Sequence, residues 1–183
     1  MKDPRPRLLA AAAALALTLA ACGDTDQPTA PPPDGGPPPV SPSPAVAEFV
    51  ELMNAHRTAM GLAALEWDPE VAAVAQAHSD DMVARGFFSH TNPDGESPFD
   101  RLHAAGIAYS AAGENIAYGY PTAESVLAAW LGSDGHRANI ENAGYTHHGV
   151  GLAGTHWTHL FIRMPTGARG AAPAPARRLP PSR

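Results

Sequence analysis

The sequence predicts a domain of the α+β class, in which helices pack against an antiparallel sheet. Two observations favour this class. Across residues 45–131, apolar side chains recur every three or four positions, as they do on one face of an α-helix. Across residues 146–164 the pattern instead indicates two strands joined at a turn. Helices and strands that are segregated along a chain in this way are typical of layered α+β domains.

Four helices are predicted, because four amphipathic stretches each start at a capping residue and stop at a glycine. In three of them a proline follows the cap directly, at a position where its missing N–H group costs nothing. The stretches begin at Ser43-Pro44, Asp68-Pro69, Ser97-Pro98 and Thr122, and they stop at Gly61, Gly86, Gly106 and Gly132.

The C-terminal part predicts a hairpin of residues 146–153 and 156–164 around Gly154-Thr155. Residues 116–120 form a third and weaker strand candidate. No internal repeat is visible, so the sheet is expected to belong to a single domain.

The N-terminus has the pattern of a bacterial secretion signal. A basic start precedes the apolar run 8–19, which is too short to cross a bilayer and has the length of a signal-peptide core. The run ends in Leu19-Ala20-Ala21-Cys22, which resembles the lipobox at which a cysteine is acylated. We expect residues 1–21 to be a lipoprotein signal peptide and Cys22 to carry palmitate-like chains that anchor the protein. The alternative is an ordinary signal peptide with an incidental cysteine.

An anchored protein of this kind is extracytoplasmic. In a Gram-positive cell it stays on the outer face of the cell membrane, whereas Gly23 after Cys22 permits transfer to the outer membrane of a Gram-negative cell. Because Cys22 is the only cysteine, the rest of the chain has no disulfide, no cysteine nucleophile and no cysteine-based zinc site.

Low-complexity segments flank the predicted domain. Residues 22–44 are rich in proline and predict an extended linker, and residues 166–183 predict a disordered tail of Ala, Pro and Arg. Residues 45–165 are enough for one hydrophobic core, and we expect a monomer. The chain has a formal net charge of −6, so nucleic acid is not an expected partner.

Three short motifs each place one ionisable side chain beside glycine or turn residues. These side chains are His90, Glu114 and His136. Glycine gives the backbone conformations that can hold a polar side chain in a fixed pose. If the three side chains converge, they could bind a metal, relay protons or tie loops together. The motifs are FSHTNPDG at 88–95, GENIA at 113–117 and SDGHRANI at 133–140.

The motifs occur in an order that resembles the CAP superfamily of cysteine-rich secretory, antigen 5 and pathogenesis-related proteins, also called SCP-like proteins. The bacterial, cysteine-free branch is the most similar. The resemblance spans residues 45–165 and implies an α-β-α sandwich with a central antiparallel sheet and a cleft. The matching blocks are AQAHSDDM at 75–82, FFSHTNPDG at 87–95, GENIA at 113–117, AAW at 128–130, GHRANI at 135–140 and GVGLA at 149–153.

In this family, two histidines and two acidic residues line the cleft. On this sequence, His90 and His136 match the two histidines, and Glu114 matches the first acid. The second acid is absent, because its position falls near Ser133 with Asp134 beside it. We expect Ser133 to be a hydrogen-bonding replacement, and Asp134 could supply a carboxylate only if its side chain turned inward.

His90 and His136 are the expected ligands if the cleft binds a divalent metal such as zinc, since neutral imidazole is a common zinc ligand. Some members of the resembling family hold a divalent metal between these histidines. Without a full ligand set the binding should be weak, and no other cofactor is expected. The alternative role for Glu114 is structural, because a carboxylate can accept backbone N–H bonds and tie loops together.

Other residues are expected to be structural. His78 lies on the apolar face of the second predicted helix, where a histidine is usually a hydrogen-bonded core residue. Asn92-Pro93-Asp94-Gly95 predicts a turn rather than a calcium loop, since the acidic spacing of an EF-hand is absent. The hairpin histidines are expected to be solvated or packed in pairs; they are His147, His148, His156 and His159.

The leading functional hypothesis is a non-catalytic binding module of the envelope. Its cleft, with His90, Glu114, Ser133 and His136, would receive a small apolar ligand, a peptide or a wall fragment. The first alternative is a metal-dependent hydrolase of peptide or peptidoglycan that uses His90, Glu114 and His136. The second is a structural envelope protein. Ser89 and Ser133 are nucleophile candidates by proximity alone, and no Gly-x-Ser-x-Gly elbow is present.

Overall fold

A computed structural model describes residues 41–166, which form five helices and four strands. The helices are α1 (Pro44–Ala59), α2 (Pro69–Arg85), α3 (Pro98–Ala104), α4 (Ala123–Leu131) and α5 (Asp134–Ile140). The strands are β1 (Glu66–Trp67), β2 (Ala111–Tyr118), β3 (His147–Ala153) and β4 (His156–Arg163).

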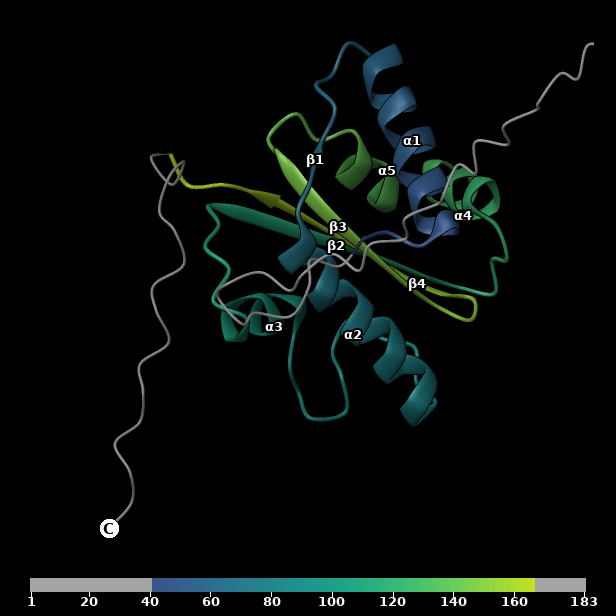
Figure 1. Ribbon diagram of the computed structural model, residues 1–183, viewed down its shortest axis with the longest axis vertical. Coiled ribbons are helices and arrows are strands. Elements are labelled where there is room, and N and C mark those ends of the chain that lie inside the picture. The colour runs from purple at the N-terminus through teal and green to yellow at the C-terminus, as the bar shows by residue number, and fades with distance from the viewer. Residues whose placement is uncertain (1–40, 167–183) are drawn as a thin grey trace, which may run out of the picture. The chain divides into compact units, whose positions relative to one another are not determined.

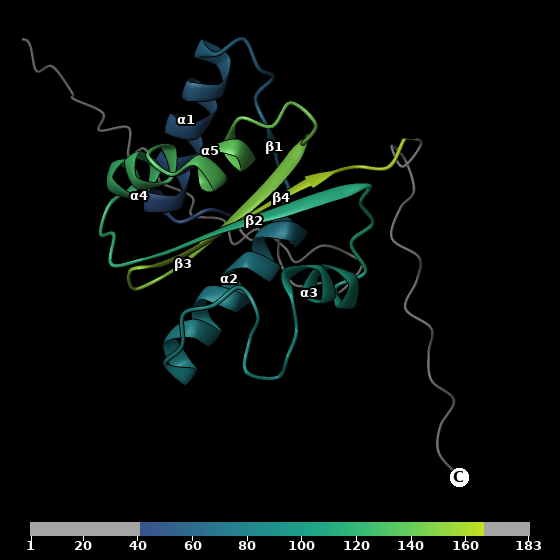
Figure 2. The same ribbon diagram turned by 180° about the vertical axis from the view of Figure 1, so that it is seen from behind.

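The helices cover both faces of one sheet. Helices α1, α4 and α5 lie on one face and α2 and α3 lie on the other, as seen from opposite sides in Figure 1 and Figure 2. The strand order is β1-β3-β4-β2, and pairing is antiparallel except between the two-residue β1 and β3. The predicted α+β class and the α-β-α sandwich with a central antiparallel sheet are confirmed.

The four predicted helix starts are found where the sequence placed them. At each start a side chain accepts backbone N–H groups that have no partner inside the helix. Asp68 caps α2 with two such bonds, and Ser97 and Thr122 form capping boxes at α3 and α4. Gly86, with a φ of 67°, ends α2 in the left-handed conformation.

The sheet separates two hydrophobic cores. Burial of these side chains supplies the packing energy of the domain, because residues 41–166 contain no cysteine for a disulfide. Fully buried side chains on the α1 and α4 face include Phe49, Trp130, Trp157 and Phe161. Those on the α2 and α3 face include Val71, Leu102, Leu160 and Ile162.

Helix α2 packs directly on the backbone of β3. A Cβ atom at Gly149 would overlap the backbone of α2 at Ala72, and one at Gly151 would overlap the backbone at Gln76. Glycine is therefore needed at both positions for the helix to approach the strand this closely. This contact explains the two glycines of the GVGLA motif.

Two elements differ from the prediction. Strand β2 begins at Ala111 rather than at residue 116, because its pairing with β4 includes Ala112 and Gly113. Alanine and glycine have weak strand preferences, so the sequence pattern did not predict this part of the strand. Helix α5 is not predicted by the sequence pattern. Its start has no side-chain capping bond, and Gly135 in its first turn disfavours a helix.

None of the helices among residues 41–166 is long and apolar enough to cross a bilayer. The predicted signal peptide (1–21), the acylated Cys22 and nearly all of the linker (22–44) lie outside the described residues, as does the tail beyond residue 166. These assignments therefore stay predictions.

Candidate functional site

His90 lies in the loop that joins α2 to α3, and hydrogen bonds on both sides fix this loop. Buried His78 of α2 donates from Nε2 to the backbone oxygen of Ser89 at 3.0 Å, in agreement with its predicted role as a hydrogen-bonded core residue. Asn92 closes the next turn, because its side-chain oxygen accepts two backbone N–H groups further along. The His90 side chain remains 50% exposed.

Glu114 lies in the middle of β2, and its side chain is only 2% exposed. Its Oε1 accepts a hydrogen bond from Nδ1 of His90 at 2.8 Å, and its Oε2 accepts one from Nη2 of Arg101 at 2.7 Å. Both oxygens are therefore engaged, which compensates for the burial of the charge. Glu114 both ties the loop to the sheet and orients His90.

The bond to Glu114 sets the tautomer of His90. Because an ionised carboxylate can only accept, Nδ1 of His90 is assigned as the donor. A neutral His90 then presents the lone pair of Nε2 away from Glu114, and a protonated His90 presents an N–H group there. The ring is thus held in one orientation while its outer nitrogen remains free to bind.

Arg101 of α3 belongs to this site, and sequence reasoning missed it. Besides Glu114, its Nη1 donates to the backbone oxygens of His90 at 2.9 Å and Glu96 at 3.0 Å. One arginine therefore holds the buried carboxylate and the loop together. The sequence did not predict this role, because the partners of Arg101 are distant along the chain and no local pattern links them to it.

His136 projects from α5, and two asparagines tie this helix to β2. Asn115 donates from Nδ2 to the backbone oxygen of His136 at 3.0 Å, and Asn139 donates to the side-chain oxygen of Asn115 at 2.8 Å. Burial of the His136 ring lowers its pKa, and the nearby charge of His90 lowers it further. The structure thus brings His90, Glu114 and His136 to one place.

Ser133 and Asp134 have different surroundings at the start of α5. Ser133 lines the same pocket as His136, and its hydroxyl makes no capping bond. Asp134 has a side chain 95% exposed, and it pairs with Arg137 at 2.7 Å. Asp134 therefore does not turn inward, and it does not replace the missing acid.

A pocket of about 320 Å³ adjoins this cluster. Such a volume lies at the lower end of the range of about 300–1,000 Å³ for small-molecule sites. His90 and Glu114 do not line the pocket themselves, but Phe88, two residues before His90, does. The other lining side chains include Tyr118, Tyr120, Trp130, Ser133 and His136.

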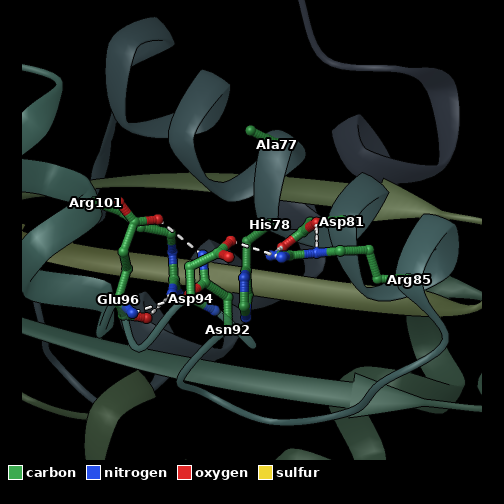
Figure 3. Close-up of a pocket in the computed structure, with 8 residues that line it drawn as sticks. All are labelled: Ala77, His78, Asp81, Arg85, Asn92, Asp94, Glu96 and Arg101. Carbon is green, nitrogen blue, oxygen red and sulfur yellow. Dashed lines mark hydrogen bonds and ion pairs between the residues drawn. The ribbon is translucent and has the colours of Figure 1, made fainter.

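A second pocket, of about 370 Å³, is lined by residues of α2, α3 and the loop between them (Figure 3). Arg85 pairs there with both Asp81 and Asp94, as the dashed lines in Figure 3 show. His78 and Arg101 also line it, and both hold the backbone of the loop. The charged groups of this pocket bind one another or the loop. We therefore assign these groups the role of holding the His90 loop in place rather than of binding a ligand.

The residues present do not complete a metal site. Catalytic zinc sites have three protein ligands, whereas His90 and His136 supply only two imidazoles here. Both oxygens of Glu114 are already bonded. Among residues 41–166, no group of three or more His, Cys, Asp or Glu side chains is arranged to hold a metal ion.

Comparisons with known proteins agree with this fold. The profile of the cysteine-rich secretory protein family, CAP, matches residues 50–159. The protein YkwD of Bacillus subtilis is 46% identical over 117 residues, and the membrane protein YlbC of the same organism is 41% identical over 116 residues. Each alignment covers 63% of this chain but only 46% of YkwD and 34% of YlbC. The chain therefore spans less than half the length of these relatives.

Solved structures extend the comparison. An extracellular protein containing an SCP domain from Bacillus anthracis is 38% identical with a TM-score of 0.62, over 64% of this chain and 39% of that one. An outer surface protein from Borrelia burgdorferi has a TM-score of 0.64 over 69% of this chain and 97% of its own. At 21% identity, the latter shows the fold alone. Both of these relatives are extracellular or surface proteins.

Proposed function

The chain belongs to the cysteine-rich secretory protein (CAP) family, and on this premise we propose that it is a non-catalytic binding module of the bacterial cell envelope. Its ligand is a small apolar molecule, a peptide or a cell-wall fragment. The extracellular relative from Bacillus anthracis supports a location outside the cytoplasm. The lipobox-like sequence at Cys22 supports a lipid anchor in that location.

One observation carries the proposal. The pocket of about 320 Å³ combines aromatic walls with the polar side chains of Ser133 and His136, beside an imidazole that Glu114 holds in place. Apolar walls with a few fixed polar groups are the usual composition of a small-molecule site. The bonds of Arg101 and Glu114 position His90 before any ligand arrives, which lowers the entropy lost on binding.

The hydrolase alternative has one favourable observation. A histidine oriented by a buried carboxylate, as His90 is by Glu114, is the arrangement found in general bases. A nucleophile bonded to that base is missing from the described residues, because neither Ser89 nor Ser133 hydrogen-bonds to His90 or His136. Ser89 instead accepts the backbone N–H of Thr91 at 3.2 Å. The arrangement therefore supports binding more than catalysis.

The test is native mass spectrometry of the full chain purified from its own cell envelope. We expect a bound small molecule that is retained by the unmodified protein and lost in His136→Ala. The matched control is His103→Ala, which removes an exposed histidine of α3 and should leave the ligand in place.

Activity assays decide between the alternatives. Cleavage of peptide or muropeptide libraries that His90→Ala abolishes would contradict a non-catalytic module and favour a hydrolase. If replacing both His90 and His136 leaves ligand content and cell phenotype unchanged, a structural envelope protein is favoured instead.

A further inference from the structure

We propose that the pocket binds the pyranose ring of a glycan, which stacks on an aromatic platform formed by Phe88, Tyr118 and His156. This inference rests on the proposed function, since it names the ligand class of the same pocket.

The platform is a row of three rings from three different segments. Phe88 precedes His90 in the loop, Tyr118 ends β2 and His156 begins β4. The ring centroids of Phe88 and Tyr118 are 6.1 Å apart, and those of Tyr118 and His156 are 4.4 Å apart in a stacked pair. Both neighbours contact Tyr118 and restrict its orientation, while the ring stays 59% exposed.

Two rings of this platform are exposed although they are large and apolar. Phe88 is 49% exposed and Tyr118 is 59% exposed, and both line the pocket. Exposed aromatic rings grouped at a pocket are a mark of a binding site, whereas a single exposed ring needs no explanation. Phe99, which is 46% exposed on α3, is such a single ring.

Polar side chains also line the pocket or lie beside it. Within the part of the chain that the structure describes, the Ser133 hydroxyl makes no capping hydrogen bond, and both Ser133 and His136 line the pocket. His90 uses only Nδ1. The pocket thus combines an aromatic surface with polar side chains that can donate and accept hydrogen bonds.

A pyranose ring matches this combination. The C–H groups on one face of the ring carry partial positive charge and pack on the negative face of an aromatic ring. The hydroxyl groups at the edge of the sugar can then bond to His136 and Ser133. An acyl chain would cover these polar groups without bonding them, at a cost of about 1–3 kcal/mol for each one.

The size and charge of the site also favour a sugar. A pocket of about 320 Å³ accommodates one ring of a polymer that continues outside it. The formal net charge of −6 disfavours a strongly acidic ligand but does not affect a neutral saccharide.

The experiment compares three probes on the full chain: a tetrasaccharide of N-acetylglucosamine, myristate and an alanine tripeptide. Binding is followed by calorimetry and by tryptophan fluorescence, to which Trp130 of the pocket lining contributes. We expect the tetrasaccharide to bind and Tyr118→Ala or Phe88→Ala to weaken it by about tenfold. Tyr118→Phe, which keeps the ring, and Phe99→Ala, which removes an exposed ring elsewhere, should bind as the unmodified chain does.

The outcomes separate the two proposals. Saccharide binding that is insensitive to Tyr118→Ala and Phe88→Ala overturns the platform. Binding of myristate or the tripeptide alone, with loss in His136→Ala, overturns the glycan ligand and leaves the binding module intact. If none of the three probes binds, the glycan ligand is rejected. The binding module is rejected separately if native mass spectra of the chain purified from its own envelope show no bound ligand.

Discussion

Arg101 and Glu114 form a buried ion pair at the centre of the site, with 2.7 Å between Nη2 and Oε2 and side chains that are 10% and 2% exposed. The carboxylate of Glu114 belongs to β2, whereas Arg101 belongs to α3 and also holds the backbone oxygen of His90. The pair therefore connects a helix, the sheet and the His90 loop.

Replacing Arg101 should destabilise the domain. Arg101→Ala leaves the carboxylate of Glu114 buried without its cation, and removal of one partner from a buried pair costs about 3 kcal/mol or more. We expect a lower midpoint of urea unfolding. The control is Arg85→Ala, whose guanidinium pairs with Asp81 and Asp94 at the surface and should contribute little. Equal midpoints for the two variants would contradict the central role of the Arg101 pair.

The buried pair of His148 and His159 should make folding sensitive to acid. Nδ1 of His148 lies 3.0 Å from Nε2 of His159, in agreement with the predicted packing of hairpin histidines in pairs. Burial lowers the pKa of His148 to about 3, and it lowers the pKa of His159 well below its usual value. The positive charge of Arg57 acts in the same direction on both rings.

The sign of the pH effect follows from these lowered pKa values. Below a pH of about 6.5 the unfolded chain binds protons that the folded pair does not. The free energy of unfolding is thus highest above this pH and falls towards pH 3. His159→Gln should reduce the slope by about 1.4 kcal/mol per pH unit, measured by urea unfolding from pH 7 to pH 4. His103→Gln, at an exposed position of α3, should keep the original slope.

The contact between α2 and β3 predicts an intolerance of side chains at Gly149. Gly149→Ala places a methyl group inside the backbone of α2 at Ala72, so the helix must move, at a cost of about 1–3 kcal/mol. The matched control is Gly135→Ala in α5, where a Cβ atom meets nothing within 4 Å. Because alanine favours helix, we expect this control to be neutral or slightly stabilising in thermal unfolding. A stable Gly149→Ala protein would show that the helix can move without loss.

The helix starts could be predicted from the sequence because caps are local. Asp68 and Ser97 bond to residues two or three positions away, so the pattern of residues contains the whole interaction. The motifs likewise identified His90, which is followed by turn residues, and Glu114, which follows a glycine. The pairing of these two side chains, which are 24 residues apart, is visible only in the fold.

The remaining features depend on contacts between distant segments. Tyr118 meets His156 because the register of β2 with β4 places them opposite each other. Helix α5 lacks a capping signal, and its position is set instead by the bond of Asn115 in β2 to the helix and the bond of Asn139 in the helix to β2. Arg101 gave no signal for the same reason, since its partners lie on other elements. Tertiary contacts of this kind override local preference.

The missing acid at Ser133 predicts weak metal binding that one substitution should strengthen. With two imidazoles and no available carboxylate, we expect Zn²⁺ to bind the full chain weakly in calorimetry, and His136→Ala to abolish even this signal. Ser133→Glu restores a carboxylate beside His136 and should tighten binding by at least about tenfold. Asp134→Ala is the control, because this exposed side chain pairs with Arg137 instead. Tight stoichiometric binding by the unmodified chain would contradict the two-ligand account.

Lipidation at Cys22 is the prediction on which the proposed location depends. The apolar run 8–19 is a short signal-peptide core, and Leu19-Ala20-Ala21-Cys22 ends it at the position where cleavage is expected. Two or more acyl chains on Cys22 give stable anchoring, because each buried CH₂ group contributes about 0.8 kcal/mol. Cells grown with a clickable fatty acid should label the unmodified protein and leave Cys22→Ala unlabelled. The same variant should move from the membrane fraction to the extracytoplasmic soluble fraction, and labelling that persists in it would place the anchor elsewhere in the chain.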